Sequence, residues 1–237
     1  SSATETSTAL IDKYNEIGNN YAITSADIGS AMERSAAALK VAGNTLDESI
    51  GLITAGNLIQ QDADTTANAL KVMSLRIRGS KTELEDMGEE TDNLATSTSK
   101  LRNELKSLTG VDIMSDDKTY KSTAKIIQEI GEVWDTLDNV SQANVLEKLA
   151  GKTRASTVAG LIENYETIEK VANDAAKAQG SALRENIEYM DSIEGRTAQL
   201  TTQVQEFWYT LIDSDLVKGF TTLLTDLLGL LTDVVDN

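Results

Sequence analysis

The chain has 237 residues with a formal net charge of −17, and it contains no histidine, cysteine or proline. Without His and Cys there can be no Ser-His-Asp triad, Cys-His dyad, thiolate metal site, imidazole base or disulfide, and the acidic balance disfavours specific binding to nucleic-acid phosphates. With only two Trp, six Tyr and two Phe for an apolar pocket, we expect no enzyme, no cofactor and no metal, but an all-α protein of helices joined by polar turns.

Helix starts in the first part of the chain are marked by capping patterns. Thr24 with Asp27, and Thr45 with Glu48, place a hydroxyl three residues before a carboxylate, the arrangement of a capping box. The first helix is predicted to end at residues 43–44, the second to run from 46 to about 58 or 59, and the third from 64 to 78, where Gly79 stops it. Residues 80–114, rich in Ser and Thr, predict a more broken region.

Two clusters of basic residues stand out locally in this acidic chain. Arg76, Arg78 and Lys81 form one, and Lys118, Lys121 and Lys125 would share a helix face at i, i+3 and i+7. Neither cluster interleaves aromatic residues for base stacking, so both are interpreted as solvated faces.

Residues 115–177 predict short helices. Ser115 with the two aspartates after it offers a helix start, and a strong apolar face follows at Ile126, Ile127, Ile130, Val133, Trp134 and Leu137. Two further helices are expected near 141–150 and 153–165.

Gly151-Lys152-Thr153 matches the last three letters of a nucleotide-binding P-loop. That loop needs a glycine five residues earlier and a strand leading in, but position 146 is Leu146 and the approach is helical in pattern. Gly151 is therefore predicted to be the turn between two helices, with positive φ, and Lys152 and Arg154 are expected to face solvent or a partner.

The region 178–211 predicts one long helix with a 3.5-residue apolar repeat, which is typical of a coiled-coil seam. Asn186 and Thr197 interrupt a seam otherwise formed by Met190, Ile193, Leu200, Val204, Phe207 and Leu211. The seam fits self-association or a partner, and it equally fits a helix that folds back on its own chain.

The most apolar stretch, 216–235, carries three charges that would be costly in hydrocarbon and so predicts an amphipathic helix. Its stripe consists of Leu216, Phe220, Leu223, Leu227, Leu231 and Val234. We expect residues 1–114 and 115–177 to form a helical core region and 178–237 to form the long helix and the amphipathic helix, within a fragment of a longer protein.

Five blocks of the sequence, in this order, resemble the core region of bacteriophage tail tape measure proteins. They are RSAAALKVAGNTLDESIGLITAGN (34–57), ANALKVMSLRIRGSKTELEDMGEE (67–90), KSLTGVDIMSDDKTYKSTAKIIQEIGEVWDTL (106–137), LEKLAGKTRASTVAGLIEN (146–164) and EFWYTLIDSDLVKGF (206–220).

The resemblance implies a helical, oligomeric structural protein that occupies the tail lumen, sets the length of the tail and is expelled ahead of the DNA. It implies tail tube, tail-tip and tail chaperone proteins as partners, and residence in the virion after assembly in the host cytoplasm. The alternative is a membrane-active helical module that uses the 216–235 stripe for transient membrane contact during genome delivery.

Overall fold

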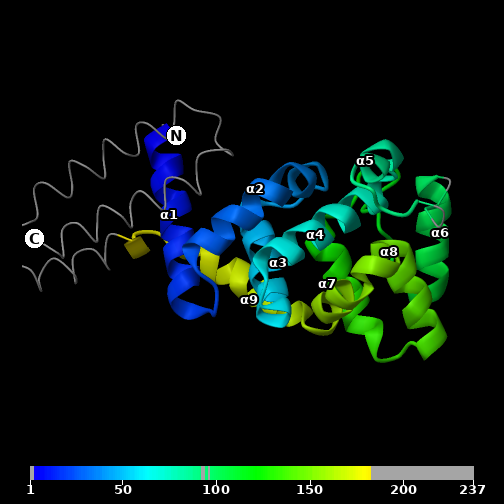
Figure 1. Ribbon diagram of the computed structural model, residues 1–237. Helices are drawn as coiled ribbons and strands as arrows, with labels where there is room; N and C mark the ends of the chain where they lie inside the picture. The colour runs from blue at the N-terminus through cyan, green and yellow to red at the C-terminus, as the bar shows by residue number, and fades with distance from the viewer. Residues whose placement is uncertain (1–2, 92–93, 96, 183–237) are drawn as a thin grey trace, which may run out of the picture.

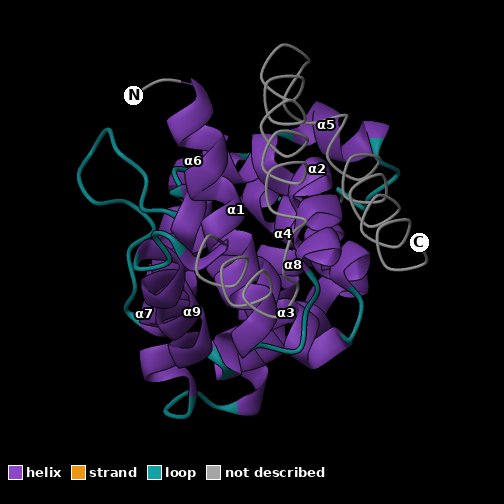
Figure 2. Cartoon of the chain, turned by 90° about the vertical axis from the view of Figure 1, so that its left-hand side faces the viewer, coloured by secondary structure: helices purple, strands orange, loops and turns teal. Residues whose placement is uncertain are grey.

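The structure, a computed structural model, describes residues 3–91, 94, 95 and 97–182, and this part of the chain is all-α as the composition predicts (Figure 1). Seen from the side, the described residues are helices joined by loops (Figure 2). The helices in chain order are α1 Ala3–Asn20, α2 Ser25–Val41, α3 Leu46–Gln60, α4 Ala63–Arg78, α5 Lys81–Asp86, α6 Thr98–Thr109, α7 Thr123–Trp134, α8 Asn139–Glu163 and α9 Tyr165–Ala176.

Both predicted capping boxes are confirmed. The Asp27 amide donates to the Thr24 hydroxyl over 3.0 Å, and the Thr24 amide donates to the Asp27 carboxylate over 3.2 Å. Thr45 and Glu48 exchange the same pair of bonds at 3.1 and 2.7 Å. Each box satisfies two amides at a helix N-terminus, which fixes where α2 and α3 begin.

Helix α3 is the centre of the body. Residues 49–57 are all buried, and the helix contacts α2, α4, α7, α8 and α9. Its approach to α9 requires Gly51, because a Cβ at this position would lie 2.6 Å from the Ile168 carbonyl oxygen. A helix that is apolar on all sides must be covered on all sides, so α3 ties the early and late parts of the described chain into one core.

The apolar face predicted between residues 126 and 137 packs into that core. Ile126, Ile127, Ile130 and Trp134 are buried, while Val133 and Leu137 are partly buried against the same cluster. Their spacing brings the apolar side chains to one side of α7 and leaves its polar residues outside.

The prediction of a helix start at Ser115 is wrong. Helix α7 begins at Thr123, and Ser122 caps it by accepting the Lys125 amide over 3.1 Å. Lys118 and Lys121 consequently lie in the preceding loop and do not share a helix face with Lys125, so that prediction is wrong too. The reason is local, because the Asp116 carboxylate binds the amides of its own turn.

The described chain ends just inside the predicted long helix. After α9 the chain makes a turn at Gly180, with φ of 77°, and becomes helical again at residue 181. The predicted seam at 186–211 and the stripe at 216–235 lie outside the described residues. Among the helices that are described, none is both long and apolar enough to cross a membrane.

A charge placed in the core face of α7 tests this packing. Ile130→Asp should lower the free energy of unfolding by more than about 3 kcal/mol, because Ile130 is fully buried and an unpaired carboxylate would lose its hydration. Val140→Asp is the control, since Val140 is 70% exposed and the substitution should change stability by less than about 0.5 kcal/mol. Equal thermal melts for the two variants would contradict the packing described for α7.

Candidate functional site

Gly151 interrupts α8 in the middle. Its backbone has φ of 66° and ψ of −177°, so the helix turns a corner there and continues in a second half. This region of conformational space is essentially restricted to glycine, because any Cβ is strained in it. The Gly-Lys-Thr stretch is thus a kink between two helical halves, with helix on both sides instead of the strand that leads into a phosphate loop.

The guanidinium of Arg76, at the end of α4, occupies the inside of this kink. Its Nε donates to the Lys148 carbonyl over 3.1 Å and one terminal nitrogen donates to the Glu147 carbonyl over 3.2 Å. The other terminal nitrogen donates over 3.0 Å to the carbonyl of Glu90, in the segment after α5. Carbonyls in the last turn before a helix break lose their usual amide partners, and a cation there also faces the negative end of the helix dipole.

Arg76 is 1% exposed, so its interpretation as part of a solvated face is wrong. Burial lowers the pKa of its guanidinium, while the nearby carboxylates of Glu89, Glu147 and Glu90 act in the opposite direction. Arginine stays protonated in proteins, so the buried group is a cation whose charge is balanced by helix carbonyls and by carboxylates at a distance. The charged side chain is part of the core structure, where it cannot serve an outside ligand.

Acidic residues of neighbouring segments engage the other cations around the kink. Lys148 pairs with Glu104 of α6 at 2.6 Å, Arg154 with Glu89 at 2.9 Å, and Lys152 with Glu90 at 3.5 Å. The expectation that both side chains face solvent or a partner is confirmed for Lys152, whose side chain is 66% exposed, and is wrong for Arg154, which is 25% exposed and paired within the body. An anion at this position would have to displace the protein's own carboxylates, which argues further against a phosphate site.

Arg78 makes a second bridge from the same end of α4. Its side chain is half-buried, so the prediction that it lies on a solvated face is also wrong. One terminal nitrogen donates to the carbonyls of Ala42, at the end of α2, and Lys121, just before α7, over 2.5 and 3.1 Å. Its guanidinium also stacks 3.9 Å from the centre of the Tyr120 ring. The two arginines together fasten the last turn of α4 to four other segments.

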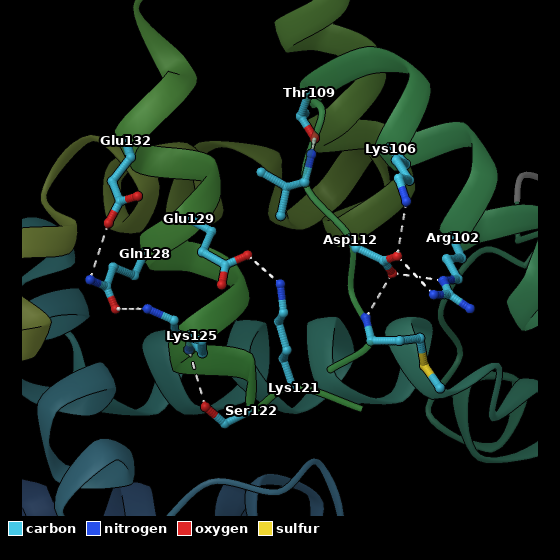
Figure 3. Close-up of polar contacts among 12 residues, drawn as sticks. Arg102, Lys106, Thr109, Asp112, Lys121, Ser122, Lys125, Gln128, Glu129 and Glu132 are labelled. Carbon is cyan, nitrogen blue, oxygen red and sulfur yellow. Dashed lines mark hydrogen bonds and ion pairs between the residues drawn. The ribbon is translucent and has the colours of Figure 1, made fainter. Parts of the chain in front are cut away.

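The loop between α6 and α7 is organised by Asp112 (Figure 3). Its carboxylate accepts two bonds from the Arg102 guanidinium, at 2.7 and 2.8 Å, one from the Met114 amide at 3.0 Å and one from Lys106 at 3.3 Å. These donors, Arg102 first, hold the pKa of Asp112 well below its usual range. The network fixes the turn after Gly110 to the body of α6.

The tip of this loop is exposed and is held by backbone hydrogen bonds. Ser115 and Thr119 are joined by a backbone bond of 2.8 Å, and Lys121 donates back to Ile113 over 3.0 Å, as in a small hairpin. Lys121 then reaches Glu129 of α7 with its ammonium group, as Figure 3 shows. The Asp pair at 116–117, which was interpreted as a helix start, belongs to this loop, and the pairing of Arg102 with Asp112 has no signal in the local pattern.

Of the predicted seam, stripe and helix-turn residues, only the helix-turn residue Gly151 lies within the described range. The seam residues Met190, Ile193, Leu200, Val204, Phe207 and Leu211 lie outside it, as do the stripe residues Leu216, Phe220, Leu223, Leu227, Leu231 and Val234. Within the described ranges, no cluster of three or more acidic side chains could hold a metal ion. The polar networks in these ranges connect segments of this chain to one another.

An all-α body whose charged groups serve its own architecture is the arrangement of a structural module. The model of the phage-related minor tail protein family matches residues 1–151, and the chain belongs to that family. It is accordingly a phage tail protein with a structural role. No solved structure matches the chain significantly.

Replacing the glycine at the kink tests its role. Gly151→Ala should lower the free energy of unfolding by about 3 kcal/mol, because alanine is strained at this φ and ψ and its Cβ would lie 3.3 Å from an Arg76 nitrogen. Gly110→Ala is the matched control, since Gly110 also has positive φ but has open space around it, and should cost about 1–2 kcal/mol. Chemical denaturation measures both, and a smaller loss at Gly151 than at Gly110 would refute the account of the kink.

The Asp112 network predicts a specific pH dependence. Because its pKa is depressed in the folded state, Asp112 stabilises the fold fully above its unfolded pKa of about 4, and this stabilisation is lost as the pH falls through the folded value. Asp112→Asn should therefore flatten the decline of stability with acidification below about pH 5. The decline should not vanish, since the pKa values of the helix-cap and turn aspartates Asp62, Asp116 and Asp138 are also lowered.

Asp117→Asn is the control for this pH profile. The Asp117 side chain is 96% exposed and lies 3.6 Å from Arg102, so its removal should leave the slope nearly unchanged. Identical slopes for wild type and Asp112→Asn would show that the network does not stabilise the fold.

Proposed function

We propose that this chain is a segment of a tape measure protein, in which a folded helical body precedes the start of a length-setting helix. The observation that carries the proposal is the order of the five resembling blocks, which extend from the body (34–164) into the segment after it (206–220). Membership of a minor tail protein family supports the same tail location.

The fold of residues 3–182 supports different roles for the folded body and for the segment after it. Helices α2 to α9 have at most 25 residues each and fold back on one another into one body, with α3 in contact with α2, α4, α7, α8 and α9, an arrangement unsuited to spanning a distance. The sequence after residue 182 has a 3.5-residue apolar repeat, interrupted by Asn186 and Thr197, which fits an extended, self-associating helix. In this proposal the body serves assembly or docking, and the following helix begins the ruler inside the tail lumen.

The negative net charge of the chain supports a location in the tail lumen, through which the DNA leaves. With a net charge of −17, the chain repels a polyanion, so DNA that follows it out of the tail does not adhere to it. In this proposal the chain binds tail tube, tail-tip and tail chaperone proteins and further copies of itself during assembly in the host cytoplasm. The proposed role involves no catalysis. The membrane-active alternative rests on the stripe at 216–235 alone and stays a prediction.

Tail length in virions tests the proposal. An in-frame deletion of residues 183–210 removes four heptads, keeps the seam in phase and begins after the last described residue, so the body is intact. If this segment is extended helix in the ruler, tails measured by electron microscopy should shorten by about 42 Å or the nearest whole ring of tube protein.

The matched control replaces residues 183–210 by an unrelated helical sequence of 28 residues with the same apolar spacing, which should restore the original length. Normal assembly of tails with unchanged length after the deletion would rule out a length-setting role for this segment.

A further inference from the structure

The first helix of the described chain lies against its last residues. The Asp12 carboxylate of α1 accepts the amide of Gly180 over 2.7 Å and that of Ala182 over 3.1 Å. Next to it, the Asn15 amide group donates to the Ser181 hydroxyl over 3.1 Å. The partners in each contact are separated by more than 160 residues of sequence.

Asp12 acts as a helix cap supplied from another helix. The chain turns at Gly180 and becomes helical at residue 181, so the amides of this first turn have no partners within their own helix. A carboxylate at a helix N-terminus satisfies these amides and also complements the helix dipole. Asp12 is only 4% exposed, and bonds from amides to a buried anion are stronger than those between neutral groups.

Further contacts close the same junction. Lys13 donates to the Ala175 carbonyl over 2.8 Å and pairs with Asp47 of α3 at 2.6 Å. The Tyr21 hydroxyl binds the Asp174 carboxylate over 2.5 Å, and burial followed by this bond raises the pKa of Tyr21 to about 12. Beneath these polar contacts, α1 packs its buried side chains into the common core. Polar and apolar contacts thus hold α1 on α9 and on the residues after it.

We infer that α1 is a clasp that closes residues 3–182 into a knob, so that the last described residues lie beside the first helix. Figure 1 shows α1 and the end of the described chain at the same end of the body. As one straight helix, residues 12–182 would span about 255 Å. The closed knob adds almost none of this distance, so these residues do not contribute to any length that the protein sets. This consequence for tail length rests on the proposed function; the clasp itself does not.

Crosslinking in intact virions tests the inference. The 237 residues contain no cysteine, so Asn15→Cys with Ser181→Cys introduces the two thiols of this chain on opposite sides of the clasp. A short bis-maleimide should join the pair in most molecules, both in purified protein and in virions. Asn15→Cys with Lys81→Cys is the control pair, because Lys81 is exposed on α5 at the opposite end of the body, and it should not crosslink.

Each outcome decides the inference. Crosslinking in purified protein but not in virions means that the body opens during assembly, and no crosslinking in either means that the clasp does not form; both overturn the inference. A second pair, Tyr21→Cys with Asp174→Cys, covers the case in which the first pair lowers the melting temperature. Failure of the proposed function gives a different result. The 183–210 deletion would then leave tail length unchanged, while the Asn15→Cys and Ser181→Cys pair would still crosslink.

Discussion

The folded body depends most on one buried cation, Arg76. Its guanidinium binds three main-chain carbonyls from two segments that are distant in sequence, and the kink at Gly151 is what leaves two of those carbonyls available. Removal of the guanidinium would leave buried carbonyls without its donors, and substitution of Gly151 would add a Cβ 3.3 Å from an Arg76 nitrogen. The glycine and the arginine therefore form a single structural unit that couples α4 to α8.

The same end of α4 explains how the rest of the body is held together. Arg78 extends the coupling to the end of α2 and to the loop before α7, and the acidic segment around Glu89 and Glu90 closes the far side of the kink. Helix α3 packs against α4, and its residues 49–57 are all buried. Basic residues are scarce in this acidic chain, and those near the kink neutralise its own carboxylates and helix ends. The opposite end of the body is closed by α1 on residues 175–182.

Local signals in the sequence predict the helices well and the long-range polar contacts poorly. Capping boxes at Thr24 and Thr45, the stop at Gly79 and the apolar face of α7 depend on neighbours within a few residues, and all are confirmed. The burial of Arg76 depends on carbonyls 14 to 72 residues away, which no spacing reveals. Likewise the loop before α7 follows from the turn-forming Asp116, which competes with the helix start expected at Ser115. The family was predictable as a phage tail protein because whole blocks of sequence, more specific than any motif, resemble one class.

The Arg76 guanidinium is the group that couples α4 to α8, and the exchange of its Nε proton with water tests this role most directly. In protein labelled with nitrogen-15, the Arg76 side-chain resonance, assigned by its loss in Arg76→Lys, should exchange with water far more slowly than that of Arg34, which is half exposed. The exchange should become faster in Gly151→Ala, because the strained backbone and the added methyl group disturb the kink. Exchange at Arg76 as fast as at Arg34 in the unmodified protein would contradict the account.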